Sequence, residues 1–408
     1  MKSKPQNEKS IISKIIFIQE IIMIKRLKFY RNNNFKNILK LLIITLFLYS
    51  CNSDKKEAVV KPILVDKNAS NKTLELYAKL VNISKNGFAV GHQDDTSYGL
   101  GWNYKDDPTT IKSDVKKVTG DFPAVFGFDI GWIEIDKPYN LDTVPFNAMR
   151  DLIIDAHKKG AIITISWHAN NPVSGGDSWD QTNAVPNIIK GGDQQEKYEL
   201  WVSRVANFIA SLKYKGEAIP IIFRPFHEMN GSWFWWGGKN CDAKDYITLW
   251  RETVHLLRDT HNLHNLLYVY SPNKLNPSDT YLEYYPGDEY VDILGMDIYD
   301  FYDAEDFQKS VINDLAIVKK IATEKNKLYA FSETGLESIK TENWFTEVLY
   351  PAIENSGISW VLTWRNYDEK HHYMPYNGHV NEADFIKFEE LPKTIFLEDL
   401  NNLNNELR

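Results

Sequence analysis

Eight short apolar runs, separated by stretches in which apolar residues return every three or four positions, constrain the fold of this 408-residue chain most strongly. Buried strands that alternate with amphipathic helices are typical of parallel sheets, and eight such alternations predict a closed (β/α)8 barrel of the TIM type, in the α/β class. The predicted strands are residues 88–91, 124–128, 161–166, 219–223, 266–270, 291–296, 327–331 and 358–363. The predicted helices are residues 147–159, 195–212, 244–260, 307–324 and 344–355.

A doubly wound open sheet is the alternative fold for this alternation. Such a sheet usually carries a glycine-rich phosphate loop after its first strand, but residues 91–101 are polar and lack that pattern. No internal repeat, linker or low-complexity tract divides the body of the chain. We therefore predict one catalytic barrel domain over residues 71–408, without an appended binding module.

The amino terminus has the composition of an export signal. A basic region is followed by an apolar run over residues 38–50, which predicts a signal peptide over residues 1–50, with Met23 as an alternative start. Leu48-Tyr-Ser-Cys51 resembles a bacterial lipoprotein box, which predicts acylation of Cys51 and a lipid anchor with a polar tether over residues 51–70. The expected location is the cell envelope, lipid-anchored at the outer membrane and facing the periplasm or the surface; plain secretion is the alternative.

Cysteine content and charge narrow the class of partner. If Cys51 carries lipid, Cys241 is the one remaining cysteine and the mature fold has no internal disulfide. The first fifty residues hold ten Lys/Arg and two Asp/Glu, which leaves 37 basic and 53 acidic residues and a formal charge of −16 for the body. So acidic a body disfavours nucleic acid as a partner, and we expect a monomer that binds a neutral ligand and meets the membrane only through its anchor.

Residues 223–237, Phe-Arg-Pro-Phe-His-Glu-Met-Asn-Gly-Ser-Trp-Phe-Trp-Trp-Gly, are the strongest candidate for an active site. Arg224, His227 and Glu228 come at the end of the fourth predicted strand, and Gly231 allows the backbone to turn. Trp233, Trp235 and Trp236 follow on a loop, where flat apolar faces suit the stacking of sugar rings. The alternative is that Glu228 pairs with Arg224 and the tryptophans fill a core, which the alternation of polar and aromatic residues disfavours.

In a barrel of this type, the residues that follow the strands share one rim. Glu333 follows the seventh predicted strand, as Glu228 follows the fourth. Two carboxylates across a polar, Trp-lined cleft can cleave a glycosidic bond, because one protonates the leaving oxygen while the other meets positive charge at the sugar carbon. Their like charge keeps one of them protonated. Other predicted rim residues are His92, Asp94, Asp129, Trp132, Trp167, His168, Asn273, Asp297, Tyr299, Trp364 and Arg365.

Arg224-Pro-Phe-His-Glu-Met-Asn-Gly-Ser-Trp-Phe-Trp-Trp-Gly237 and Ser332-Glu-Thr-Gly335 together resemble glycoside hydrolase family 26, whose members are chiefly β-mannanases. Residues 167–172, 295–299 and 363–366 are similar to further blocks of that family in the same order, so the resemblance spans roughly residues 91–366. The amino-terminal segment lies outside it.

The resemblance implies a retaining double displacement with Glu228 as acid/base and Glu333 as nucleophile. His227 would replace the Asn that most related barrel glycosidases place before the acid/base. Tyr299 would donate a hydrogen bond to the nucleophile, and Trp364 would form the platform under the sugar at the cleavage position. The alternatives are that His227 is a strand-end hydrogen bonder and Trp364 a core residue.

The resemblance also implies that His168 and Trp233 contact sugars near the scissile bond and that Arg365 lies towards the non-reducing side. Residues 174–188 match the family loosely, so Trp179 is either a sugar ligand or a loop anchor. His92 and Asp94 either bind sugar or cap the segment that follows them. His371 and His372 are adjacent, which is not the spacing of a defined metal site; we expect them to be solvated, and we expect neither a metal nor a cofactor.

The resemblance implies endo-hydrolysis of β-1,4-mannosidic bonds in mannan, glucomannan or galactomannan, with a mannan-type poly- or oligosaccharide as partner. Other members of the family cleave β-1,3-xylan or mixed-linkage β-glucan, and either substrate remains an alternative. A catalytically silent glycan-binding lipoprotein is an alternative of another class. The second glutamate disfavours it, because a binding site has no need of two opposed carboxylates.

Overall fold

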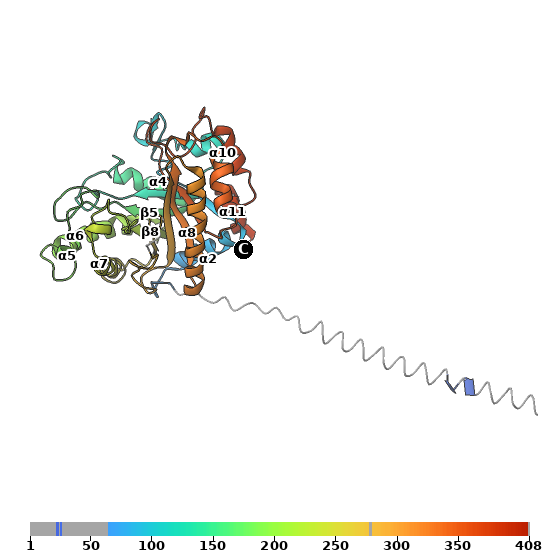
Figure 1. The fold of residues 1–408 in the computed structure, drawn as a ribbon, viewed down its shortest axis with the longest axis horizontal. Coiled ribbons are helices and arrows are strands. Elements are labelled where there is room, and N and C mark those ends of the chain that lie inside the picture. Colours follow the sequence, from blue (N-terminus) through green and yellow to red (C-terminus); the bar gives the residue numbers. More distant parts are fainter. Residues whose placement is uncertain (1–21, 24, 27–63, 277–279, 407–408) are drawn as a thin grey trace, which may run out of the picture. The chain divides into compact units, whose positions relative to one another are not determined.

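The computed structural model describes residues 22–23, 25–26, 64–276 and 280–406, and its main folded unit is Pro62–Arg408 (Figure 1). Cys51, most of the predicted signal peptide and residues 51–63 of the predicted tether lie outside the described residues. The domain boundaries predicted at residues 50 and 70 stay predictions.

Eight parallel strands form a closed barrel, as predicted. Each strand pairs with its neighbours along the chain, and the last pairs with the first through Ala89–Trp360 to His92–Thr363. The strands are β1 (Phe88–Gln93), β4 (Val125–Asp129), β5 (Ile162–Trp167), β8 (Ile221–Pro225), β9 (Leu266–Tyr270), β10 (Ile293–Asp300), β11 (Leu328–Leu336) and β12 (Trp360–Thr363). Every predicted strand overlaps one of these. The two-residue strand β13 (Thr394–Ile395) pairs with β1 outside the ring.

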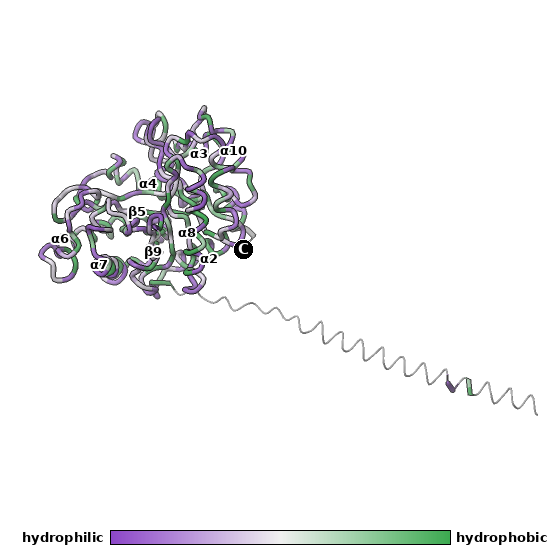
Figure 2. The backbone as a smooth tube through the Cα atoms, in the orientation of Figure 1, coloured by the Kyte–Doolittle hydropathy of each residue, from purple (hydrophilic) through white to green (hydrophobic). Residues whose placement is uncertain are grey.

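The outer helices follow the predicted periodicity and carry both hydrophobic and hydrophilic residues along their length (Figure 2). They include α3 (Asp114–Thr119), α4 (Phe146–Lys158), α6 (Gln195–Ser211), α7 (Ala243–His255), α8 (Ala304–Lys325), α10 (Glu382–Glu389) and α11 (Leu397–Glu406). In Figure 1, α6 and α7 lie on one side of the strands and α8, α10 and α11 on the other.

Two predicted helices are irregular. Residues 244–260 form α7 and then a π-helical turn, η3 (Leu256–Thr260), and residues 344–355 form a π-helical turn, η5 (Trp344–Leu349), followed by α9 (Tyr350–Ile353). Pro351 stands in the first turn of α9, where its missing N–H costs nothing, although the same residue cannot continue a regular helix from η5. Apolar periodicity locates such segments but does not reveal a change of helical pitch.

The base of the barrel is closed by α2 (Asn71–Asn86), which begins at the N-cap Ser70. Its buried Leu76, Leu80 and Ile83 belong to the same apolar cluster as the inward-facing Ala89, Val125, Ile162, Ile222, Leu267 and Trp360 of the strands. The second and larger cluster joins the outward faces of the strands to the helices. Since α2 covers the amino-terminal ends of the strands, chemistry is left to the carboxyl-terminal rim.

Candidate active site

Glu228 and Glu333 come from the ends of two strands, β8 and β11, which β9 and β10 separate in the ring. Glu333 lies within β11, and Glu228 lies three residues after the end of β8. Phe226 and Glu228 have φ angles of 47° and 55°, so the backbone after β8 turns through the left-handed region, which non-glycine residues rarely adopt. Glu228 is 8% exposed and Glu333 5% exposed. Both carboxylates are therefore held at the rim with little access to water.

Donors occupy both oxygens of Glu333. Its Oε1 accepts a hydrogen bond of 2.7 Å from the Tyr299 hydroxyl, as the resemblance implied, and its Oε2 accepts from Arg224 Nη2. Arg224 Nη1 also donates to Asp297 Oδ2 over 2.8 Å. Asp297 in turn accepts from Ser271 and Ser332 at 2.7 and 2.8 Å. A carboxylate held from both sides in this way has a fixed orientation, as a nucleophile requires.

Glu228 has a different environment. Its Oε2 accepts from Trp233 Nε1 at 2.8 Å and its Oε1 from Asn273 Nδ2 at 2.9 Å. Burial, and then the negative charges of Glu333 and Asp297, raise the pKa of Glu228 to about 8, although Asn273 and Arg224 act in the opposite direction. Glu228 is therefore protonated at neutral pH. One carboxyl group can donate a proton while the other is held by an arginine and a tyrosine, which is the division of labour of a glycosidase pair.

His227 and His168 lie together beside the carboxylates, with ring centroids 4.6 Å apart. Burial, and then Arg224 and His168, lower the pKa of His227 well below its ordinary value, and its Nδ1 is buried without a protein partner. His168 Nδ1 contacts Asp129 Oδ2 at 2.7 Å. Burial alone would raise the pKa of Asp129, but His168 and further hydrogen bonds outweigh it and lower that pKa. His227 is thus neutral, and Asp129 orients His168.

Aromatic rings form part of the rim. Trp179 is 49% exposed and stacks on His168, with centroids 5.4 Å apart and planes at 18°. Trp364 is partly exposed and lies 5.9 Å from the same histidine, and Trp233 is 36% exposed. The structure therefore brings all three tryptophans of the predicted site to the rim. Trp179 also contacts the ring of Phe234, with centroids 5.6 Å apart. The contacts of the three tryptophans with sugar stay predictions.

The interpretation of Trp235 and Trp236 as exposed stacking faces is wrong. Both are fully buried, and their indole N–H groups donate to the backbone carbonyls of Ala169 and His227 at 2.9 and 2.8 Å. Phe226 packs against both rings. A buried indole is stable where its single donor finds an acceptor, and the loop folds back to supply one. The core alternative thus holds for these two residues but not for Trp233.

Arg365 joins three loops at the closure of the barrel. It forms an ion pair with Asp142, its Nη1 lies 3.4 Å from the hydroxyl of Tyr98, and its guanidinium lies 5.0 Å from the ring centroid of Tyr367. Asp142, from the loop after β4, was missed by the sequence reasoning, because it follows the strand by thirteen residues and nothing in its neighbourhood marks it.

His92 and Asp94 are buried and order the loop that follows β1. His92 Nδ1 contacts Asp95 Oδ1 at 2.8 Å, and Asp94 Oδ2 accepts from the Tyr98 hydroxyl at 2.8 Å.

Arg224 is buried and pairs with two carboxylates, those of Asp297 and Glu333. It is therefore both a structural counter-charge and a part of the site.

The expectation that both adjacent histidines are solvated is wrong for His372. This residue is buried, and its Nε2 lies 3.2 Å from His379 Nε2. The loop folds back on itself and brings His379 over it, a contact that adjacent positions in the sequence do not reveal. His371 is partly exposed and pairs with Glu337. Within the described ranges, no group of three or more His, Cys, Asp or Glu residues is arranged to hold a metal ion.

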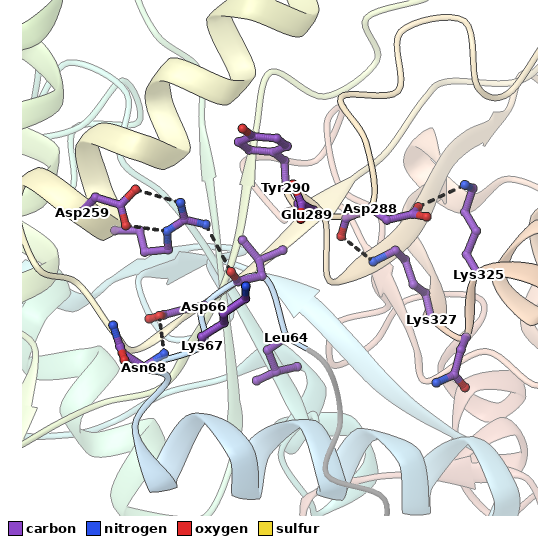
Figure 3. A pocket seen from close by; sticks show the side chains of 13 residues that line it. Leu64, Asp66, Lys67, Asn68, Asp259, Asp288, Glu289, Tyr290, Lys325 and Lys327 are labelled. Atoms are coloured by element: carbon purple, nitrogen blue, oxygen red, sulfur yellow. Dashed lines mark hydrogen bonds and ion pairs between the residues drawn. The ribbon is translucent and has the colours of Figure 1, made fainter.

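A hollow lies at the amino-terminal end of the barrel (Figure 3), with a volume of about 490 Å³. It is lined by residues 64–68, by Arg258 and Asp259, by residues 288–290 and by residues 325–327. Ion pairs lie in its lining: Arg258 pairs with Asp259, and Lys325 with Asp288. Among the helices described here, none has the length and apolar character needed to cross a membrane.

Known proteins were compared with the chain. The model of glycosyl hydrolase family 26 matches residues 65–378. A mannan endo-1,4-beta-mannosidase of Bifidobacterium adolescentis is 34% identical over 356 residues, which cover 81% of this chain and 35% of that protein. One of Bacillus subtilis is 32% identical over 314 residues, which cover 74% of this chain and 80% of the relative. The chain thus spans about a third of the bifidobacterial relative's length and most of the Bacillus relative's length.

Solved structures agree in fold. A GH26 beta-mannanase from Bacteroides ovatus superposes with a TM-score of 0.77 at 42% identity, covering 81% of this chain and 96% of that one. The catalytic domain of an endo-beta-1,4-mannanase from Bacillus sp. JAMB-750 gives 0.76 at 36% identity, covering 84% and 95%. The family match extends over the whole barrel rim, including both glutamates, and on this ground the chain belongs to glycosyl hydrolase family 26.

Proposed function

We propose that this protein is an endo-acting glycoside hydrolase that cleaves β-1,4-mannosidic bonds with retention of configuration. The observation that carries the proposal is the unequal pair of carboxyl groups: Glu228 is protonated at neutral pH, and Glu333 is oriented by Tyr299 and Arg224. Both relatives named above carry the name mannan endo-1,4-beta-mannosidase, which supports mannan as the substrate class.

In the first step, Glu333 attacks the anomeric carbon while Glu228 gives its proton to the departing glycosidic oxygen. The product is a glycosyl-enzyme, and Glu228 is left ionised. In the second step, Glu228 takes a proton from water, which attacks the anomeric carbon and releases Glu333. His227 is neutral beside this path and so adds no positive charge that would compete with Arg224 for the carboxylates.

Time-resolved product analysis on linear mannan, galactomannan and glucomannan tests the substrate class. We expect a ladder of manno-oligosaccharides early in the reaction, since endo cleavage cuts within chains. Release of a single short product from the outset would overturn endo action. Faster cleavage of β-1,3-xylan or mixed-linkage β-glucan than of any mannan would overturn the substrate class.

The assignment of roles has its own test. Glu228→Ala should cripple cleavage of mannan yet still form a glycosyl-enzyme from an aryl mannoside whose leaving group needs no proton, and azide should speed turnover and yield the β-azide. For this mechanism the two carboxyl groups stand about 5–5.5 Å apart. An α-azide product would exclude retention, and rescue of Glu333→Ala instead of Glu228→Ala would exchange the roles.

We propose further that Cys51 carries the lipid that anchors the protein in the cell envelope, on the basis of the basic and apolar segments before it. Cys51→Ala should move the protein from the membrane fraction to the soluble fraction with its specific activity on soluble mannan unchanged. Continued membrane association of this variant would exclude the anchor.

A further inference from the structure

Tyr373 lies against the tyrosine that holds the predicted nucleophile. It belongs to the loop between β12 and α10 and is buried. Its ring stands edge to face with that of Tyr299, with centroids 5.6 Å apart and planes at 71°. Tyr299 in turn donates its hydroxyl to Glu333 Oε1.

The strand that carries Glu333 leaves room for this ring. Gly335 is two residues beyond Glu333 in β11, and a Cβ atom placed on it would meet Tyr373 Cδ1 at 2.3 Å and Cγ at 3.0 Å. The ring therefore rests directly on the backbone of the nucleophile strand. It lies between that backbone and the ring of Tyr299. A side chain in this place can fix the distance of Tyr299 from the nucleophile strand.

Hydrogen bonds hold the loop on both sides of the ring. Asn366 Oδ1 accepts from the backbone N–H groups of Tyr373 and Met374 at 3.0 and 2.9 Å, and Asn366 Nδ2 donates to Asp114 Oδ2 at 3.0 Å. On the other side, Ser338 N donates to the carbonyl of His372 at 2.8 Å. The ring thus has a rigid support, as a residue that orients another requires.

We propose that Tyr373 is a positioning residue, whose ring keeps the hydroxyl of Tyr299 on Glu333; the inference rests on the proposed role of Glu333 as nucleophile. Tyr299 remains a donor at working pH, because burial and then the charge of Glu333 raise its pKa well above the ordinary value. A tyrosine that tilts out of line gives a poorer hydrogen bond to the carboxylate. The reaction is slowed, although the contacts that bind the sugar chain are kept.

A double-mutant cycle tests this inference, with Tyr373→Leu, Tyr299→Phe and the pair combined. The substrate is an aryl β-glycoside for which the first step, attack by Glu333, is slower than hydrolysis of the glycosyl-enzyme, so that kcat reports on Glu333. We expect Tyr373→Leu to lower kcat by up to about 100-fold with KM little changed. In a protein that already carries Tyr299→Phe, Tyr373→Leu should lower kcat no further. Tyr373→Phe should behave like the wild type, since the ring is kept.

Tyr376→Leu is the matched control. Tyr376 lies on the same loop but packs on His372 and His379, and we expect its loss to leave kcat unchanged. If Tyr373→Leu does not fold, Gly335→Ala takes the place of this variant in the cycle, because the added methyl group pushes the Tyr373 ring away from β11. Additive losses in the double variant, or a raised KM with kcat unchanged, would overturn the inference.

The cycle is run on whichever aryl β-glycoside the wild type turns over best. A wild type that prefers another sugar would overturn the mannan proposal and leave the cycle readable. A wild type that turns over none of them, and no mannan either, would overturn both.

Discussion

The two ends of the barrel use charge in opposite ways. At the base, the ion pairs around the hollow of Figure 3 are partly exposed: the side chains of Arg258 and Asp259 are 20% and 39% exposed, and those of Lys325 and Asp288 23% and 54%. At the catalytic rim, one buried guanidinium, that of Arg224, serves both Asp297 and Glu333. A third carboxyl group, that of Glu228, forms no ion pair with any described residue, and its raised pKa keeps it protonated at neutral pH.

This difference in burial implies that substitutions of the charged residues cost little stability at the base and much more at the rim. Exposed pairs are screened by water and contribute little to stability, whereas a buried charge without a partner is costly. The rim accepts this cost, because an acid with a raised pKa and an oriented carboxylate are both needed for the proposed chemistry. The comparison leads to three predictions.

The largest effect is expected from removing one carboxylate at each end. Glu333→Ala should abolish turnover of every glycoside substrate, because no glycosyl-enzyme can form. Asp288→Ala at the base should leave kcat and KM unchanged, since its partners Lys325 and the Tyr285 hydroxyl lie away from the rim. Initial rates on soluble mannan measure both. Residual turnover by Glu333→Ala above the background of a doubly substituted Glu228→Ala/Glu333→Ala protein would contradict the assignment.

A smaller effect, on stability, is expected from the two arginines. Arg224→Leu leaves Asp297 and Glu333 buried without their cation, and it should lower the free energy of unfolding by about 3–5 kcal/mol. Arg258→Leu, the matched change at the base, should cost about 0–1 kcal/mol. Urea unfolding measures both free energies. Equal losses would show that the rim pairs are no more demanding than surface pairs.

The third effect is an opposite pH dependence of stability at the two ends. The folded state raises the pKa of Glu228 to about 8, so it binds this proton more tightly than the unfolded chain does, and stability falls as pH rises from the ordinary glutamate range to about 8. At the base, burial tends to raise the pKa of Asp288, but Tyr285 and Lys325 outweigh it and lower that pKa. The contribution of Asp288 to the free energy of unfolding is therefore present at pH values above the ordinary aspartate range, and it is lost as pH falls through the lowered pKa.

Thermal unfolding from acid to alkaline pH therefore separates Glu228→Gln from Asp288→Asn. The first variant should gain stability over the wild type as pH rises, and the second should lose stability at neutral pH but not in strong acid. In the same range, kcat/KM of the wild type should decline above about pH 8, where Glu228 loses its proton. A decline that begins near the ordinary pKa of glutamate would show that Glu228 is not the buried acid.

Sequence alone determined the barrel and the two glutamates, because both are local. Each predicted strand is an apolar run of four to six residues, and each glutamate follows such a run, so a count of strands places Glu228 and Glu333 on one rim. The apolar period also located the helices, but not the change to π-helical pitch at η3 and η5.

Only the tertiary structure decided which side chains of the rim face the cleft and which partners hold them. Trp233 and Trp236 stand three residues apart in one motif, yet one indole donates to Glu228 and the other to the backbone of His227 in the core. Asp142 and Tyr373 reach Arg365 and Tyr299 from loops whose sequence carries no signal. Contacts between residues far apart in the chain depend on how the loops fold over the rim, and a pattern of neighbouring residues does not encode that.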